Sequence, residues 1–130
     1  MISNGTNGTI GILVLGHRQT IKGLLAVLKT RGMEFTLIEE LPSKVAIIKQ
    51  IKFDVVIIDS LIEGLEDICH RISSLTGAPV ILLLNGKEPE WRRLFNLPVD
   101  GFIKEDAGVT ELRARIRAIF QRKTKILEKL

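Results

Sequence analysis

Five short apolar runs alternate along the chain with segments of helical period. The runs span residues 10–15, 34–38, 55–58, 80–84 and 101–103, and most of their residues are Val, Ile and Leu. A strand that is buried on both faces reads as a nearly continuous apolar run, and such strands are typical of a parallel sheet covered by helices on both sides. The pattern therefore predicts an α/β domain built from five successive βα units.

The segments between these runs carry apolar residues on one face of a helix. One stripe precedes Gly32, where a helix would stop, and consists of Ile21, Leu24, Leu25 and Leu28. A second stripe consists of Leu65, Ile68, Cys69, Ile72 and Leu75. Ser43 is a predicted N-cap for a short helix that ends at residue 51, and Pro89 is expected in the first turn of another. A fifth helix is predicted from about residue 109 to the end of the chain.

Asp59 stands out because it closes the run 54–59. Right-handed crossovers place the first strand centrally, so the C-terminal ends of the first, third, fourth and fifth strands converge on one edge of the sheet. Ligands bind at that edge in open α/β sheets, although an aspartate is also a common way to end a strand. The residues predicted to share this edge with Asp59 are Gly16, His17, Leu84, Asn85, Lys104 and Glu105.

The composition narrows the class of protein. A length of 130 residues suits one domain, and a single cysteine excludes an internal disulfide. The sequence contains neither a long uncharged apolar run nor a signal-peptide core, so we expect a soluble cytoplasmic protein without a membrane span. Nineteen basic against fifteen acidic residues favour an acidic partner but fall short of a nucleic-acid-binding composition. Residues 1–9 are predicted to be a flexible tail, residues 10–122 the domain, and residues 123–130 an extension of the last helix.

The last helix carries an apolar seam whose members are alternately three and four residues apart. The seam is formed by Val109, Leu112, Ile116, Ile119, Ile126 and Leu130, with Lys123 at one of its positions. This is the heptad pattern of a coiled coil, and it predicts that the helix joins two copies into a homodimer or leads to an output domain. The alternative is that the first half of the seam is the core face of a final helix.

Several of these segments together resemble the receiver domain of bacterial response regulators. They are residues 12–15, residues 53–59 with Gly64 five residues later, residues 78–84 and residues 100–103, and the resemblance extends over residues 10–122. It implies a flavodoxin-like, doubly wound (βα)5 three-layer sandwich with the strand order 2-1-3-4-5. It also implies that Asp59 matches the aspartate that accepts a phosphoryl group from a histidine kinase in a phosphorelay.

The other residues of that site depart from the family pattern. The family has an acidic pair after the first strand that binds Mg²⁺, which requires hard oxygen ligands, whereas this chain has Gly16 and His17. Leu84 stands where the family has a Thr or Ser hydroxyl, and Glu105 stands where it has a lysine. We therefore expect no metal and no cofactor, with Mg²⁺ bound only if the site is functional.

Three residues leave alternatives open. Lys104 would reach Asp59 if the fifth strand ended early or bulged, and Asn85 would replace the missing hydroxyl if the register slipped by one residue. A protonated His17 would form an ion pair with Asp59, or else it faces solvent. If Lys104 does not reach the site, Glu105 adds a negative charge that opposes a phosphoryl group of about −1.5 to −2 charges.

These departures favour a degenerate receiver, or pseudo-receiver. Such a protein is not an enzyme and acts as a phosphorylation-independent protein-interaction module in two-component signal transduction. Its expected partner is a histidine kinase or another signalling protein. Two alternatives remain open: a functional receiver phosphorylated at Asp59, and a flavodoxin-like module that binds a small ligand at the same edge.

Two aromatic residues are candidates for an interaction surface. Phe102 matches the position of the family's aromatic switch residue, and Trp91 is predicted to lie beside it on the family's usual output face. Large aromatic residues often anchor protein interfaces. For Trp91, burial in the core is an equal alternative.

Overall fold

A five-stranded sheet forms the centre of the computed structural model, which describes residues 10–30, 33–40 and 45–129. Its strands are β1 (Gly11–Leu15), β2 (Glu34–Ile38), β3 (Val55–Asp59), β4 (Val80–Leu84) and β5 (Gly101–Lys104). They are arranged in the order β2-β1-β3-β4-β5, and every neighbouring pair is parallel. The predicted fold class and strand order are confirmed, and no predicted strand end differs from the observed one by more than one residue.

The connections between strands contain both α-helices and 3₁₀-helices. They are α1 (Lys22–Thr30), η2 (Val45–Gln50), α2 (Leu65–Leu75) and η3 (Glu88–Asn96), and α3 (Val109–Lys129) follows β5. The two shorter predicted helices are thus present in the tighter 3₁₀ form, and Pro89 lies in the first turn of η3 as expected. The predicted tail, Gly32 and Ser43 lie outside the described residues. No helix in the described ranges has the length and apolar character needed to cross a bilayer.

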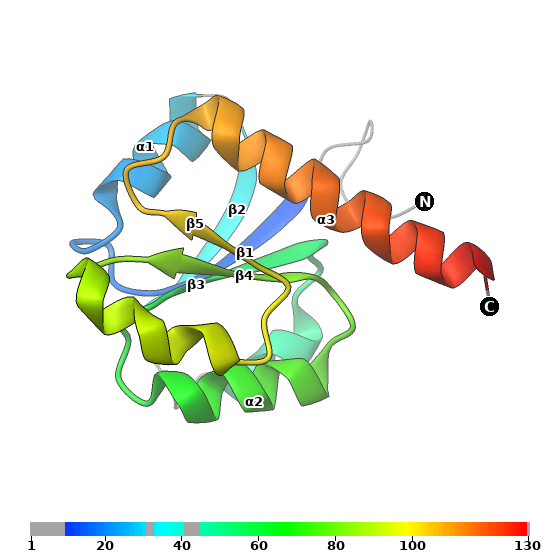
Figure 1. The fold of residues 1–130 in the computed structure, drawn as a ribbon, viewed down its shortest axis with the longest axis horizontal. Coiled ribbons are helices and arrows are strands. Elements are labelled where there is room, and N and C mark those ends of the chain that lie inside the picture. Colours follow the sequence, from blue (N-terminus) through cyan, green and yellow to red (C-terminus); the bar gives the residue numbers. More distant parts are fainter. Residues whose placement is uncertain (1–9, 31–32, 41–44, 130) are drawn as a thin grey trace.

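Helices cover both faces of the sheet (Figure 1). One face packs against α1 and α3, and the other packs against η2, α2 and η3. Neighbouring positions of β1 face opposite sides, so Val14 contributes to the first core layer and Leu15 to the second. Because both faces are buried, β1 and β4 contain no polar side chain at all. A polar side chain of a central strand is therefore expected only at a strand end, where Asp59 lies.

Two aspartates tie neighbouring strands together at the N-terminal edge of the sheet. Asp54 Oδ2 accepts a hydrogen bond of 2.8 Å from the backbone N–H of Gly11, and Asp100 Oδ2 accepts one of 2.7 Å from that of Val80. Each aspartate directly precedes a strand and bonds to the first residue of the adjacent strand. These carboxylates therefore satisfy backbone donors that a sheet edge would otherwise leave unpaired.

The first half of α3 packs on the sheet, and its second half runs past the edge of the sheet (Figure 1). Leu112, Ile116 and Ile119 are at most 4% exposed and belong to the same core layer as α1. The chain's own core encloses these three side chains, as expected for the first half of the seam if it is the core face of a final helix. Ile126 lies in the part of α3 whose side chains the structure does not describe.

Candidate functional site

Asp59 ends β3 with its side chain completely enclosed by protein. It is 0% exposed, and its carboxylate accepts hydrogen bonds from three groups. Thr20 Oγ1 donates to Oδ2 at 2.6 Å, while the Leu61 backbone N–H and Asn85 Nδ2 donate to Oδ1 at 3.1 Å and 3.3 Å. A carboxylate that is removed from water needs such donors, because burying it without them is very costly. Groups of the protein itself therefore supply the hydrogen-bond donors that the Asp59 carboxylate needs.

Asn85 joins the loop after β4 to the loop after β3 through hydrogen bonds. Its Nδ2 donates to the Thr20 carbonyl as well as to Asp59, and its backbone N–H donates to Ser60 Oγ at 2.8 Å. The Ser60 hydroxyl in turn donates to the Asn85 carbonyl at 3.2 Å. Sequence reasoning misses Thr20, although a hydroxyl side chain shortly before a helix is a recognised signal for polar contacts.

Leu84 and Asn85 occupy their positions without any slip of the strand register. Leu84 is the last residue of β4, pairs with Lys104 and is buried in the same core layer as Leu94. The chain then turns at Gly86, whose φ of 81° lies in the left-handed region that favours glycine. Asn85 reaches Asp59 from this loop, with the strand register that the sequence predicts.

Gly16 lies directly against Asp59. A Cβ atom on Gly16 would stand 2.8 Å from Asp59 Cβ and 3.4 Å from its Oδ2. The first distance is shorter than real Cβ contacts allow, so any side chain at this position requires something to shift. The position that matches the first acid of the family's acidic pair therefore has no space for a carboxylate.

His17 faces solvent and takes part in the site only through its backbone. Its imidazole is exposed, and its carbonyl accepts a hydrogen bond from the Thr20 backbone N–H at 2.9 Å and lies 3.0 Å from Thr20 Oγ1. The Asp59 carboxylate instead has Thr20, Leu61 and Asn85 as its donors. Of the two alternatives left open for His17, the structure has the solvent-facing one.

Glu105 directs its carboxylate to the beginning of α1. Its Oε1 accepts hydrogen bonds from the backbone N–H groups of Gly23 at 2.7 Å and Leu24 at 3.3 Å. These are among the donors that the first turn of a helix leaves unpaired, and the helix dipole also favours a negative charge there. A Cβ on Gly23 would stand 2.6 Å from the same Oε1, so glycine permits this close approach. The Glu105 carboxylate is thus bonded to the beginning of α1.

Lys104 turns towards Trp91 and not towards Asp59. Strand β5 continues through Lys104 without ending early, and the exposed Lys104 places Nζ 6.0 Å from the centre of the Trp91 ring. This distance is at the limit of a cation–π contact. The alternative in which Lys104 reaches Asp59 is therefore not the observed one.

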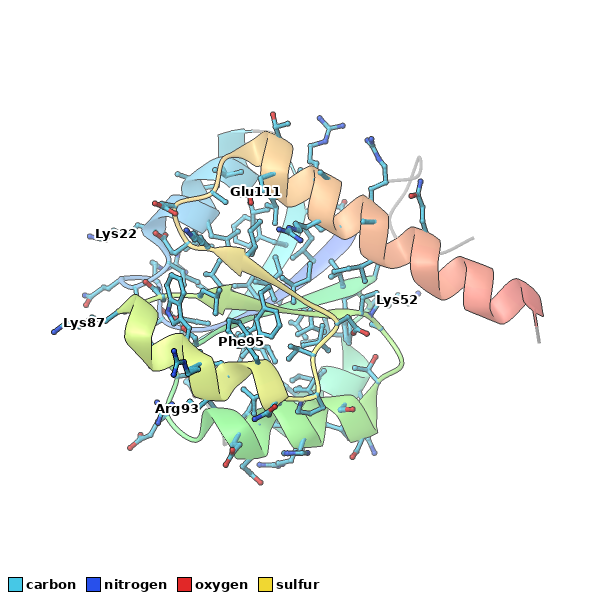
Figure 2. All side chains as sticks on the ribbon, in the orientation of Figure 1. Lys22, Lys52, Lys87, Arg93, Phe95 and Glu111 are labelled. Atoms are coloured by element: carbon cyan, nitrogen blue, oxygen red, sulfur yellow. The ribbon has the colours of Figure 1, made fainter. Side chains whose placement is uncertain are left out.

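Trp91 and Phe102 both contribute to a partly exposed surface on η3 and β5. Trp91 is half-buried, packs against the core layer that contains Leu94 and donates its Nε1–H to the Asn85 carbonyl at 3.0 Å. Phe102 is also partly exposed, but its ring partner is Phe95, with the two rings perpendicular and 5.0 Å apart. Figure 2 shows Phe95 between η3 and β5, and 56% of this residue is exposed. We call Trp91, Phe95, Phe102 and Lys104 the aromatic surface.

No cluster of metal ligands accompanies Asp59. Among the residues that the structure describes, no three His, Cys, Asp or Glu side chains are placed to hold a metal ion. Cys69 is fully buried in α2, and burial, helped by the nearby charge of Glu66, raises the pKa of its thiol to about 11. The thiol therefore stays protonated at neutral pH and behaves as a small core residue.

Comparisons with known proteins find similarity to curated sensory transduction proteins. No family model matches it. It is 26% identical over 116 residues to the sensory transduction protein RegX3 of Mycolicibacterium smegmatis, covering 85% of this chain and 50% of that protein. RegX3 of Mycobacterium tuberculosis is 25% identical over 116 residues, with 85% and 51% covered. The chain thus spans about half the length of the curated relatives it matches.

Solved structures share the fold over nearly the whole chain. A two-component response regulator from Clostridium difficile has a TM-score of 0.69 at 17% identity, covering 88% of this chain and 98% of that one. The receiver domain of sensor histidine kinase PA1611 from Pseudomonas aeruginosa, with a magnesium ion in its active-site cleft, has a TM-score of 0.69 at 15% identity, covering 85% and 97%. A receiver domain protein from Clostridium thermocellum has a TM-score of 0.68 at 20% identity, covering 90% and 98%. The sequence similarity to RegX3 and the shared fold together support the resemblance to response regulator receiver domains.

Proposed function

We propose that this receiver domain is a pseudo-receiver, which acts through protein contacts and not through phosphorylation of Asp59. The observation that carries the proposal is that the protein encloses the Asp59 side chain. Its side chain is 0% exposed, and both carboxylate oxygens already accept hydrogen bonds within the protein. A phosphoacceptor must present an oxygen in line with the group that is transferred. Here that oxygen would first have to break its bond to Thr20, Leu61 or Asn85.

The residues around Asp59 do not fit the Mg²⁺ ion that phosphoryl transfer in this fold family requires. Magnesium demands near-octahedral coordination by oxygen ligands, several of which are usually water. Gly16 provides no side chain, and His17 provides an imidazole, which is a poor ligand for this ion. Glu105 is bonded to α1. Asp59 would therefore have to bind the ion without a second carboxylate.

Among the described side chains, none places a compensating positive charge at Asp59. The exposed Lys104 contacts the Trp91 ring, and the imidazole of His17 faces solvent. Phosphoryl transfer depends on cations that neutralise the charge developing on the transferred oxygens. With neither a metal site nor a lysine directed at Asp59, we propose a module that is not an enzyme and does not use a phosphoryl group as its signal.

The position of one cavity bears on the small-ligand alternative. A cavity of about 300 Å³ lies at the opposite edge of the sheet, between η2, the start of β3 and the end of α2. Its lining is a mixture of aliphatic, aromatic and basic residues: Ile48, Lys49, Ile51, Lys52, Phe53, Leu75 and Thr76. A flavodoxin-like binding module would be expected to have its cavity beside the C-terminal ends of the strands.

Treatment with acetyl phosphate or beryllofluoride in the presence of Mg²⁺ is the direct test of the proposal. We expect the mass of the intact protein and the amide resonances around Asp59 to stay unchanged, because the carboxylate is enclosed and the metal ligands are missing. Mass spectrometry and two-dimensional NMR measure the two outcomes.

The matched control for this test is Asp59→Asn, which removes the nucleophilic carboxylate and nearly keeps its shape. An adduct that forms on the wild-type chain and not on Asp59→Asn would identify a functional receiver and overturn the pseudo-receiver proposal. An adduct that forms on both chains would mean that the reagent modifies another residue.

Partners of the module are proposed from its family. The curated relatives are named sensory transduction proteins, and the chain spans about half of their length. We propose a histidine kinase or another signalling protein as the partner, and an output domain that receives the signal. The aromatic surface is the proposed contact region, because exposed aromatic side chains beside a cation are typical of interface anchors.

Self-association is proposed for the part of α3 that runs past the sheet. The sequence there continues with the apolar residues Ile126, Leu127 and Leu130, beyond the half that packs on the domain. In the full chain, we expect the substitution Ile126→Asp to convert a dimer into a monomer in sedimentation equilibrium, because it places a charge in the proposed contact. Gln121→Asp, on an exposed residue of the same helix, is the control and should leave the dimer intact. A wild-type chain that sediments as a monomer would remove the proposal.

A further inference from the structure

We propose that Asn85 is a positioning residue that connects the buried Asp59 to Trp91 in the aromatic surface. Its side-chain Nδ2 donates to Asp59 Oδ1 at 3.3 Å, and its backbone carbonyl accepts the Trp91 Nε1–H at 3.0 Å. One residue thus bonds to both the strand end and the surface. This inference deepens the proposed function, on which its biological use rests, by naming the route from the Asp59 edge to the contact region.

The Asn85 peptide is held firmly enough to transmit a displacement. Its N–H donates to Ser60 Oγ at 2.8 Å and its carbonyl accepts from the same hydroxyl at 3.2 Å, so the loops after β3 and β4 are joined. Gly86, with a φ of 81°, follows at once and lets the chain turn directly after the Asn85 carbonyl. A change at Asp59 that displaces Asn85 as a whole would be passed to the carbonyl to which Trp91 is bonded.

At the surface end, the orientation of Trp91 determines where a positive charge lies. The Lys104 ammonium lies 6.0 Å from the centre of the Trp91 ring. A rotation of the indole would therefore alter both the aromatic surface and the position of Lys104 upon it. The residue that matches the family's hydroxyl is Leu84, which is buried in the core, so the connection runs through the next residue along the chain.

The connection can be measured because the chain offers one clean reporter. It contains a single tryptophan and no tyrosine, so the indole N–H resonance and the near-ultraviolet emission both come from Trp91. We expect Asp59→Ala to shift the indole N–H resonance, because Asn85 Nδ2 loses one of its acceptors. Asp59→Asn keeps an oxygen acceptor in the same place and should shift the resonance much less.

A double-mutant comparison separates transmission through Asn85 from a direct effect of Asp59. In an Asn85→Ala background, Asp59→Ala should produce no further shift of the indole resonance. A shift of the same size in both backgrounds would overturn the proposal, and so would the absence of any shift in Asp59→Ala alone.

The comparison needs a folded protein in every arm, and the dispersion of the amide resonances verifies this. If Asn85→Ala does not fold, Asn85→Ser is the second variant, because a short hydroxyl side chain also removes the amide that bonds Asp59. The experiment contains no phosphodonor. Its failure would therefore leave the pseudo-receiver proposal standing, and phosphorylation of Asp59 would leave this result standing.

Discussion

Replacing Asp59 by alanine is expected to lower the free energy of unfolding by about 3 kcal/mol. The substitution removes the acceptor for the Leu61 backbone N–H and one of the two acceptors of Asn85 Nδ2, and the side chain that it truncates is 0% exposed. A donor that is buried without a partner destabilises the folded state by the full free energy of its desolvation. The shorter alanine side chain also leaves a cavity. Urea denaturation followed by circular dichroism measures the loss.

Asp59→Asn is the matched control, and we expect it to cost less than about 1 kcal/mol. The new amide oxygen can accept from Leu61 and Asn85. The new amide nitrogen can donate to Thr20 Oγ1, because that hydroxyl lies 3.0 Å from the His17 carbonyl and can turn its proton there. A loss as large as that of alanine would show that the negative charge itself is needed, as it would be beside a bound cation.

Gly16→Ala is expected to lower the free energy of unfolding by about 1 to 3 kcal/mol, the usual cost of forcing an extra atom into a packed interior. The added Cβ would stand 2.8 Å from Asp59 Cβ, and Asp59 is held in place by three hydrogen bonds. The strain can be relieved only by a shift of the loop after β1 or of the end of β3. The same denaturation measurement reports the change.

Gly108→Ala is the control for this prediction, because a Cβ at residue 108 meets no atom within 4 Å. Its effect should stay within about 0.5 kcal/mol. Equal effects of the two substitutions would show that Gly16 does not closely approach Asp59. Gly16→Asp should be destabilised as well and should gain no Mg²⁺ binding in calorimetry, although it restores an acid to the family's position.

Most of the fold can be predicted from the sequence because the central strands are buried on both faces. Apolar runs such as 55–58 and 80–84 are interpreted as buried parallel strands when helical segments separate them. The right-handed crossover rule then predicts that their C-terminal ends lie at the same edge of the sheet. The meeting of Gly16, Asp59 and Asn85 at one edge follows from that topology. The 3₁₀ form of η2 and η3 does not follow, because a short apolar stripe suits either kind of helix.

The direction of each side chain at the site could not be predicted in the same way. The sequence does not show in which direction the Glu105 carboxylate points. In the structure it accepts hydrogen bonds from N–H groups at the beginning of α1, where the helix dipole favours a negative charge. Lys104 follows the alternation of β5 onto the Trp91 side. Thr20 lies in a polar stretch without any pattern, so its bond to Asp59 appears only when the loop is built.

The seam of α3 shows why a heptad pattern alone does not predict a dimer. Leu112, Ile116 and Ile119 have the spacing of a coiled coil, and the last helix of a domain needs that same spacing to cover a sheet. Only residues of the helix beyond the domain can distinguish a coiled coil from a helix that merely covers the sheet. At those positions the sequence has the apolar residues Ile126 and Leu130.

The close approach of Gly16 to Asp59 has a consequence for how such a site can evolve. Once the strand end has settled against a glycine, a later mutation to an acid meets Asp59 Cβ before it can meet a metal ion. The mutation would be destabilising and would bring no activity, so selection would remove it before Glu105 and Leu84 could change as well. If the domain is the pseudo-receiver that we propose, the glycine at residue 16 would hinder the return of an acid there, and the domain would diversify through the surfaces that it presents to other proteins.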